Sequence, residues 1–175
     1  GRADRLITRV DYALAADAWV ELLYVRSSQG RMLEGNGIAN RLFGDGGADT
    51  LRGGAGNDTI EGRLGADWME GGDGNDLLVV QQAADLVWEH AGGGLDTVQT
   101  AVSWTLMEGS EVEAIVATAD AGLMLAGNGF ANRITGRSGS DTLVGHGGDD
   151  MLDGLRGADL LIGGLGNDTY DVDHA

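Results

Sequence analysis

Large apolar residues recur every nine positions in two stretches of the chain, 44–79 and 136–171. In each nine-residue unit, positions 1 and 4 are Gly, position 6 is Asp, and position 8 is the large apolar residue. Gly favours a tight turn over positions 1–6, which leaves positions 7–9 as a short strand with one inward side chain. One inward side chain per unit cannot form a core alone. The pattern therefore predicts stacked turns, as in solenoids, with two units in each coil. The position-8 residues are Leu51, Ile60, Met69, Leu78, Leu143, Leu152, Leu161 and Tyr170.

The chain is also a tandem duplication. Residues 1–83 align with residues 93–175 without a gap and with 35 identities. A weaker nine-residue unit precedes each set, at 35–43 and 127–135, with Asn40 and Asn132 where Asp would stand. We expect a first unit over 1–83 with nonapeptides 44–79, a connector over 84–92, and a second unit over 93–175 with nonapeptides 136–171.

Composition and charge restrict the possible functions. The 175 residues include 32 Gly, no Pro and no Cys, and the net charge is −17. This excess of acidic residues argues against a nucleic-acid partner, and the lack of Cys excludes a disulfide scaffold. No apolar run is long enough to span a bilayer, while 42% hydrophobic residues are too many for typical disorder. Such a chain either tolerates strong self-repulsion or binds cations.

The ends of the sequence suggest part of a larger protein. The chain starts Gly1-Arg2 without Met, contains nothing like a cleavable signal peptide, and ends Asp173-His174-Ala175. We therefore expect a fragment or a processed product.

Stacked coils would place the position-6 carboxylates in rows, with Asp49 over Asp67 and Asp58 over Asp76. Bare rows of this kind repel one another, and a cation between successive coils reverses the sign of that interaction. Carboxylate oxygens together with turn carbonyls form the all-oxygen shell that Ca²⁺ prefers. Zinc and copper are poorly supported, because there is no Cys and the three histidines do not cluster. We expect His90, His146 and His174 to be ordinary surface residues.

The nonapeptide matches the pattern GGxGxDxUx, and the chain resembles the RTX (haemolysin-type) calcium-binding family. The units GGAGNDTIE (53–61) and GGDGNDLLV (71–79) fit every defined position. Residues 85–89 and 92–98 resemble the spacer strands between RTX blocks, and residues 166–173 resemble a block end. The resemblance implies an all-β fold, a right-handed parallel β-roll (β-solenoid) in two tandem blocks, with Ca²⁺ bound between its coils.

The resemblance also implies a ligand set for each calcium ion. Main-chain oxygens at positions 2 and 4 join the Asp of one turn, and main-chain oxygens at positions 1 and 3 join the Asp of the turn above. In the first copy, the two implied sites are Asp45, Gly47, Asp49, Gly62, Leu64 and Asp67, and then Gly54, Gly56, Asp58, Gly71, Asp73 and Asp76. In the second copy they are Arg137, Gly139, Asp141, Gly154, Arg156 and Asp159, and then His146, Gly148, Asp150, Gly163, Leu165 and Asp168. We expect further amide-oxygen ligands from Asn36, Asn40, Asn128 and Asn132.

The sequence also suggests roles for several other residues. Asp85, Glu89 and Asp96 lie in the spacer and are not assigned as ligands. Arg41 and Arg133 match across the copies, and we expect each to form a surface ion pair with a neighbouring Asp. Trp19 and Trp104 are expected to pack in the core or between blocks. A group of outward apolar residues predicts a contact surface: Trp68, Val144, Leu160 and Ile162.

No catalytic motif of the metalloprotease, serine hydrolase or cysteine nucleophile type is present, so no enzyme is expected within this chain. We expect a calcium-binding β-roll module of a larger secreted bacterial protein, of a family typically exported by type I secretion. Its partners would be Ca²⁺ and other domains of the parent protein. One alternative is a calcium-dependent polysaccharide-binding or adhesion module. Another is the C-terminal RTX part of a secreted epimerase, protease or lipase.

Overall fold

The computed structural model describes residues 3–173, which form two compact units divided between residues 96 and 97. His174, expected to be a surface residue, lies outside the described residues. Residues 3–173 contain β-strands and no α-helix, so no helix in this part of the chain is long and apolar enough to cross a membrane. The all-β prediction is confirmed.

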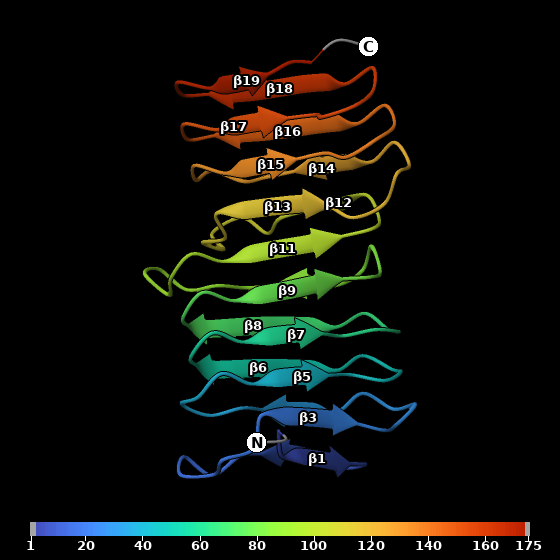
Figure 1. Cartoon of the computed structure of the whole chain (residues 1–175), viewed down its shortest axis with the longest axis vertical. Helices are drawn as coiled ribbons and strands as arrows, with labels where there is room; N and C mark the ends of the chain where they lie inside the picture. The colour runs from blue at the N-terminus through green and yellow to red at the C-terminus, as the bar shows by residue number, and fades with distance from the viewer. Residues whose placement is uncertain (1–2, 174–175) are drawn as a thin grey trace. The chain divides into compact units, whose positions relative to one another are not determined.

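In the first unit, strands alternate between two parallel sheets (Figure 1). One sheet has the order β1 (Arg5–Thr8), β3 (Leu22–Val25), β5 (Arg41–Phe43), β7 (Thr59–Glu61) and β9 (Leu77–Val80). The other has the order β2 (Tyr12–Ala13), β4 (Met32–Glu34), β6 (Thr50–Ala55), β8 (Trp68–Asp73) and β10 (Leu86–Val87). The chain thus contributes one strand to each sheet in every coil, as the nonapeptide pattern predicts.

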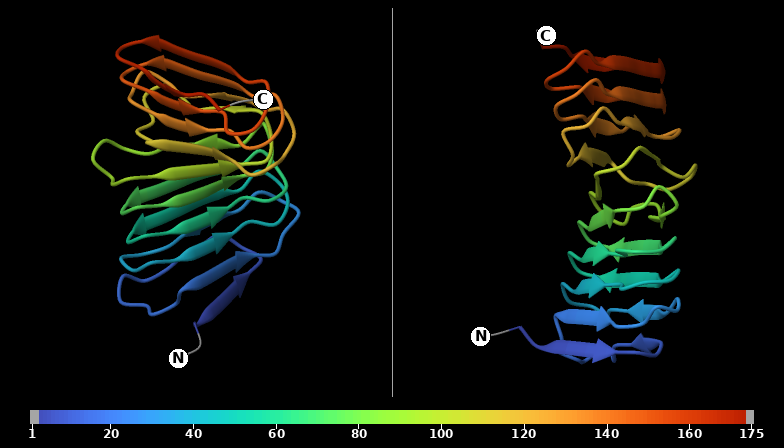
Figure 2. Two further views of the ribbon diagram at one scale, coloured as in Figure 1. Left: turned by 45° about the horizontal axis from the view of Figure 1, so that its top comes forward. Right: turned by 90° about the vertical axis from the view of Figure 1, so that its right-hand side faces the viewer.

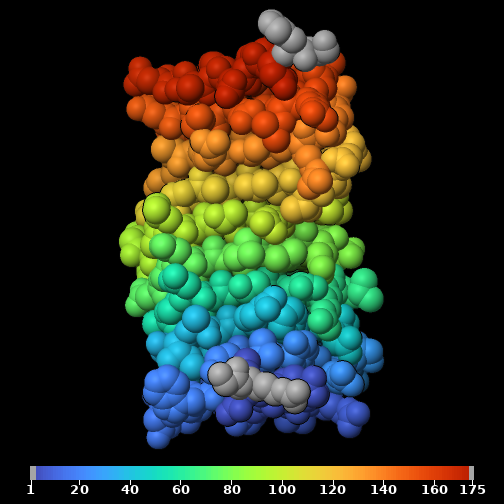
Figure 3. All heavy atoms as spheres, in the orientation of Figure 1, coloured from blue at the N-terminus to red at the C-terminus, as the bar shows by residue number. Residues whose placement is uncertain are grey.

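The second unit repeats this arrangement (Figure 2). One sheet contains β11 (Thr97–Thr100), β13 (Ala114–Ala117), β15 (Arg133–Thr135), β17 (Met151–Asp153) and β19 (Thr169–Asp171). The other contains β12 (Trp104–Thr105), β14 (Met124–Ala126), β16 (Thr142–Gly147) and β18 (Leu160–Leu165). Each unit is therefore a parallel β-roll, and its coils appear as successive bands in the space-filling view (Figure 3).

The position-8 side chains form the core of each roll. Strand pairing places Leu51 beside Met69 and Ile60 beside Leu78, so the partners stand two nonapeptides apart in the sequence. All four side chains are fully buried, as are Leu143 and Leu152 in the second unit. Burying one such side chain contributes about 1.5–3 kcal/mol, so the stabilisation accumulates coil by coil.

The last two position-8 residues keep the strand register of the core, with Leu161 beside Leu143 and Tyr170 beside Leu152, but they are less buried than the others. Leu161 is half-buried, and Tyr170 is 47% exposed. An inward side chain is buried only where a neighbouring coil covers it, and no described coil follows Tyr170. The expected packing role is wrong for Trp19, which is 75% exposed, whereas Trp104 is buried at 4%.

The two constant glycine positions of the nonapeptide serve different purposes. Position 4 has a positive φ in every repeat, for example 103° at Gly56 and 145° at Gly65, which only Gly adopts without strain. Position 1 does not have a positive φ. A Cβ at position 1 would instead collide with oxygen atoms of its own turn and, in half of the repeats, with a carbonyl of the next coil.

Candidate metal centre

The position-6 aspartates form a hydrogen-bonded ladder along each unit. The main-chain N–H of Asp49 donates to Asp67 Oδ1 (2.7 Å), and that of Asp58 donates to Asp76 Oδ1 (2.7 Å). In the second unit, the N–H of Asp141 donates to Asp159 Oδ1 (2.7 Å). The expected stacking of Asp49 with Asp67 and of Asp58 with Asp76 is therefore present. One oxygen of each carboxylate is used to hold the preceding coil.

The other carboxylate oxygen is left over in several turns. Oδ2 of Asp58, Asp67, Asp76 and Asp150 is buried and accepts no hydrogen bond. These aspartates are 1–2% exposed, and none of them forms an ion pair within the described part of the chain. A buried carboxylate without a counter-charge costs several kcal/mol, so these oxygens are placed where a cation would be strongly favoured.

Four Oδ2 atoms lie beside a main-chain carbonyl of the next coil: those of Asp58 and Asp150, which accept no hydrogen bond, and those of Asp49 and Asp141, which accept from the N–H groups of Asp45 (3.2 Å) and Arg137 (3.1 Å). A Cβ added at Gly53 would lie against Asp58 Oδ2 and 2.6 Å from the carbonyl oxygen of Gly71. The same pairing of an Asp Oδ2 with the position-1 carbonyl of the next coil occurs at Gly44, Gly136 and Gly145. We call each such pairing of an Asp Oδ2 with a position-1 carbonyl a cradle. The four cradles join Asp49 with Gly62, Asp58 with Gly71, Asp141 with Gly154, and Asp150 with Gly163.

The carbonyls at positions 2 and 4 also face the next coil. The carbonyl oxygens of Gly47, Gly56, Gly139 and Gly148 lie against the position-4 Gly of the next coil, and those of Gly54 and His146 lie against its position-2 Gly. Other predicted donors are engaged in main-chain hydrogen bonds. The carbonyl of Asp45 accepts from Leu64 (3.3 Å), that of Arg137 accepts from Arg156 (3.0 Å), and that of Asp73 accepts from Gly56 (2.7 Å).

The predicted asparagine donors are occupied by protein hydrogen bonds. Asn40 Oδ1 accepts from the N–H of Asn36 (2.9 Å), and its Nδ2 donates to the carbonyl of Val20 (2.9 Å). Asn132 makes the equivalent bonds with Asn128 and Val112. The side-chain amides of Asn36 and Asn128 donate to carbonyls of the preceding coil. This arrangement favours a structural role for Asn40 and Asn132, whose side-chain amides form hydrogen bonds between coils without needing a cation.

Burial raises the pKa of several ladder carboxylates. Desolvation raises the pKa of Asp58 to about 7 and that of Asp67 to about 6, although the main-chain N–H bond to each partly opposes the rise. Desolvation also raises the pKa of Asp49, Asp76 and Asp150. Without a cation, the folded state thus favours the protonated form of these groups.

These pKa shifts predict that acid stabilises the calcium-free roll. A carboxyl group whose folded pKa is raised contributes stability that is fully present below its unfolded pKa, near 3.8, and is lost as pH rises through its folded value. For Asp67 and Asp58, this window extends from about pH 4 to about pH 7. Calcium-free protein should therefore gain β-structure in far-UV circular dichroism when the pH falls from 8 to 5. A loss of structure over that range would contradict the burial argument, and saturating Ca²⁺ should remove the gain.

Two spacer aspartates continue the ladder, and a spacer glutamate bonds the same coil; none of the three was predicted as a ligand from the sequence. Asp85 Oδ1 accepts from the N–H of Asp67 (3.2 Å), and Asp96 Oδ1 accepts from that of Asp76 (2.8 Å). Glu89 is fully buried, and burial raises its pKa to about 8. Two of these contacts could have been predicted from the 18-residue spacing between coils, because residue 85 follows residue 67, and residue 89 follows residue 71, by that interval.

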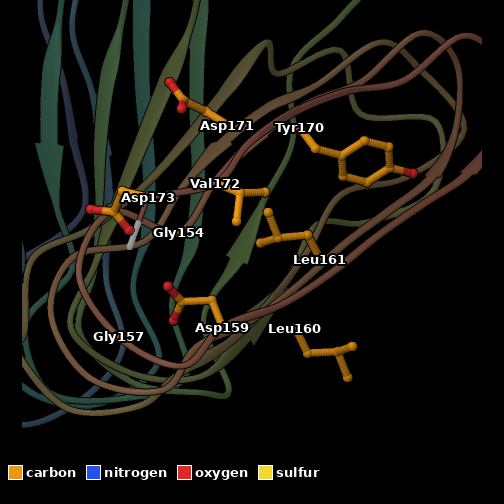
Figure 4. Close-up of a pocket in the computed structure, with 9 residues that line it drawn as sticks. All are labelled: Gly154, Gly157, Asp159, Leu160, Leu161, Tyr170, Asp171, Val172 and Asp173. Carbon is orange, nitrogen blue, oxygen red and sulfur yellow. The ribbon is translucent and has the colours of Figure 1, made fainter. Parts of the chain in front are cut away.

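The C-terminal side of the second unit is more open. Figure 4 shows a pocket lined by Gly154, Gly157 and Asp159 together with Leu161, Tyr170 and Val172. Asp159 and Asp168 are less buried there than Asp141 and Asp150 in the same ladder. The carboxylates of Asp159 and Asp168 therefore retain contact with solvent, whereas Gly154 and Gly163 are buried.

The expected ion pairs of the matched arginines are absent from residues 3–173. The guanidinium of Arg41 lies over the ring of Phe43, 5.6 Å from its centroid, and Arg133 Nη1 contacts Met151 Sδ at 2.8 Å. Among the described histidines, His90 lies 3.1 Å from Asp73 Oδ1 and His146 is exposed.

The described residues contain no cluster of three or more His, Cys, Asp or Glu side chains arranged to hold a metal ion. Each cradle instead pairs carboxylate oxygen with main-chain carbonyl oxygen. This donor set suits a hard cation with many oxygen ligands better than zinc or copper.

Comparison with known families supports the same chemistry. A family model for the RTX calcium-binding nonapeptide repeat, in four copies, matches residues 34–79, 126–161 and 147–173, which together cover more than half of the chain. A search of curated proteins found no match.

Proposed function

The chain belongs to the family of RTX calcium-binding nonapeptide repeats, and we propose that it is a folding-on-calcium module of a larger secreted bacterial protein. In this proposal the module itself is not catalytic. It stabilises attached domains and supports their export. Cytosolic calcium is low and extracellular calcium is high, so the chain would remain unfolded before export and fold outside the cell.

The observation that carries this proposal is the set of buried carboxylate oxygens that accept no hydrogen bond. Oδ2 of Asp58 and Oδ2 of Asp150 each share a cradle with a position-1 carbonyl of the next coil. The carbonyls of Gly54, Gly56, His146 and Gly148 face the same next coils. We infer that Ca²⁺ is held at these cradles and at those of Asp49 and Asp141, where it supplies the missing positive charge.

A metal that binds only the folded chain contributes its binding free energy to folding. The test is a Ca²⁺ titration recorded by far-UV circular dichroism, with Mg²⁺ as the comparison ion. Gain of β-structure with Ca²⁺, but not with equal Mg²⁺, supports the proposal. A chain that is fully folded in excess chelator and unchanged by Ca²⁺ would overturn it.

A second candidate function is the binding of an anionic polysaccharide, favoured by one surface of the first unit. Tyr24 and Phe43 stack with ring centroids 4.6 Å apart on neighbouring strands β3 and β5. The guanidinium groups of Arg5, Arg41 and Arg63 lie 5.1–6.0 Å from these rings. Contact with the rings restrains the guanidinium groups of Arg5 and Arg41 and leaves their N–H edges for a carboxylate, whereas Arg63 also pairs with Glu61 at 3.5 Å. In a chain of net charge −17, this local group of arginines is where a polyuronate would bind.

The matched arginines of the two copies allow a direct test of this candidate. Affinity electrophoresis in a gel containing a polyuronate, with Ca²⁺ present, should show retardation of the unaltered chain. Arg41→Ala should weaken binding about two- to five-fold, the range of one exposed charge contact. Arg133→Ala is the control, because Arg133 occupies the same repeat position without an aromatic pair. Equal weakening by both substitutions would argue against the patch.

A further inference from the structure

The junction between the last nonapeptide of the first unit and its spacer contains a carboxylate in an unusual position. Glu89 stands one full coil after Gly71, so it occupies the place where a nonapeptide would have its position-1 Gly. Its side chain turns back to the preceding coil. Glu89 Oε1 accepts from the N–H of Gly71 (2.6 Å), and Oε2 accepts from the N–H of Gly72 (3.0 Å). These bonds fix a fully buried carboxylate against the turn that begins at Gly71.

A second buried carboxylate approaches the same glycine. Asp76 Oδ1 accepts a hydrogen bond from the N–H of Asp58, but Asp76 Oδ2 is buried and accepts no hydrogen bond. A Cβ added at Gly71 would collide with this Oδ2 atom. Asp76 is 2% exposed and forms no ion pair within the described residues. An uncompensated oxygen thus lies against the glycine whose N–H is bound by Glu89.

The junction reproduces the cradles of the repeats with one change. In four repeat turns, the Asp Oδ2 meets the carbonyl of the position-1 Gly of the next coil. At the turn of Gly71, the residue in that place is Glu89, which brings a carboxylate to this turn. The carbonyl oxygens of Gly72 and Gly74 face the spacer at Gly93 and Gly94, as the position-2 and position-4 carbonyls do elsewhere.

We infer that Asp76, Glu89 and the carbonyls of Gly72 and Gly74 form a further calcium site, outside the nonapeptide pairs and completed by a spacer side chain. This inference rests on the proposed function, because it assumes that the repeat cradles hold calcium. Two carboxylates with several carbonyls give a hard, all-oxygen donor set of the kind that Ca²⁺ takes. A surface pocket lined by Glu34, Arg52, Glu70, Asp73 and His90 borders Gly71 and Gly72 and gives solvent access to this turn; within it, Arg52 pairs with Glu70 at 3.1 Å.

The site is tested by counting bound ions on the full 175-residue chain. Native mass spectrometry in saturating Ca²⁺ would compare the unaltered chain with Glu89→Gln and with Glu108→Gln, an exposed carboxylate of the second unit. Glu89→Gln keeps the size of the side chain and an oxygen acceptor but removes the charge. It should bind one ion fewer, while Glu108→Gln binds the same number as the unaltered chain. An unchanged count for Glu89→Gln would overturn the inference, because a purely structural Glu89 would not alter ion number.

A measurement on the unaltered chain covers the case in which Glu89→Gln fails to fold. Crystals grown with Tb³⁺ in place of Ca²⁺ should show an anomalous-difference peak beside Glu89 and Asp76. Peaks confined to the nonapeptide turns would overturn this site alone and leave the proposed function intact. An absence of peaks throughout, together with no bound Ca²⁺ in the mass spectra, would overturn both.

Discussion

Removal of calcium is expected to unfold the chain almost completely at neutral pH. Neighbouring ladder carboxylates lie on adjacent coils, roughly 5 Å apart, and at an effective dielectric constant near 20 two such charges repel by about 3 kcal/mol. This repulsion recurs along each ladder, and only protonation or a cation relieves it. The core offers one large side chain per nonapeptide, so the hydrophobic contribution per coil is modest.

The contribution of bound calcium is large enough to decide whether the roll folds. One site filled at 100 times its dissociation constant stabilises the folded state by about 2.7 kcal/mol. Four such sites would contribute about 11 kcal/mol, which is comparable to the whole stability of a typical domain, about 5–15 kcal/mol.

Circular dichroism in excess chelator at pH 7.5 measures this effect, and readdition of Ca²⁺ serves as the control for reversibility. We expect loss of most β-signal in chelator and its return with calcium. Full retention of the folded signal in chelator would mean that hydrogen bonds and core packing alone hold the roll.

The substitution Asp58→Asn is expected to change stability in opposite directions with and without calcium. Asn keeps an Oδ1 atom for the N–H of Asn40, now bonded at 2.7 Å, and gains an amide that can donate to the nearby carbonyl of Gly71. Without calcium, the variant should therefore be more stable than the unaltered chain, because a buried charge has been removed. With calcium, it should be less stable by roughly 3–5 kcal/mol, the cost of removing one partner of a buried charge pair.

Urea unfolding of Asp58→Asn is measured in saturating Ca²⁺ and, with a stabilising osmolyte, in chelator at pH 8, where Asp58 is mostly ionised because its folded pKa is about 7. Asp17→Asn is the matched control, since Asp17 is exposed and lies in a loop outside the ladder. It should shift both midpoints little. A destabilisation of Asp58→Asn that is equal in both conditions would assign Asp58 a structural role only.

The repeat period made most of the fold predictable. Gly at positions 1 and 4, Asp at position 6 and a large residue at position 8 fix the turn, the ladder and the core. The pairing of Leu51 with Met69 follows directly from a coil of two nonapeptides. Asn40 occupies the Asp position of a weaker repeat, as the sequence indicated. Its side-chain amide donates to the Val20 carbonyl, so this position needs no cation to balance a charge.

Features that depend on neighbouring coils were harder to predict. Tyr170 fits the position-8 pattern, yet its burial depends on a covering coil and not on the repeat itself. Arg41 stacks on Phe43, two positions further along the same strand, where an ion pair was expected. The spacer part of the ladder was not predicted, because the Gly and Asp positions of the nonapeptide are not repeated there, although the spacing between coils stays close to 18 residues. Glu89 keeps the interval of one coil from Gly71, and Asp96 follows Asp76 at a slightly longer interval.

The aspartate ladder gives each unit a direction. In every rung, the carboxylate belongs to the later coil and the N–H belongs to the coil before it, as from Asp67 back to Asp49 and from Asp76 back to Asp58. A coil is therefore fastened by the coil that follows it in sequence. Damage at one aspartate frees a main-chain amide on the N-terminal side, while the rung on its C-terminal side stays closed. A substitution at one aspartate therefore affects the bonding of the coil before it and leaves the rung to the coil after it in place.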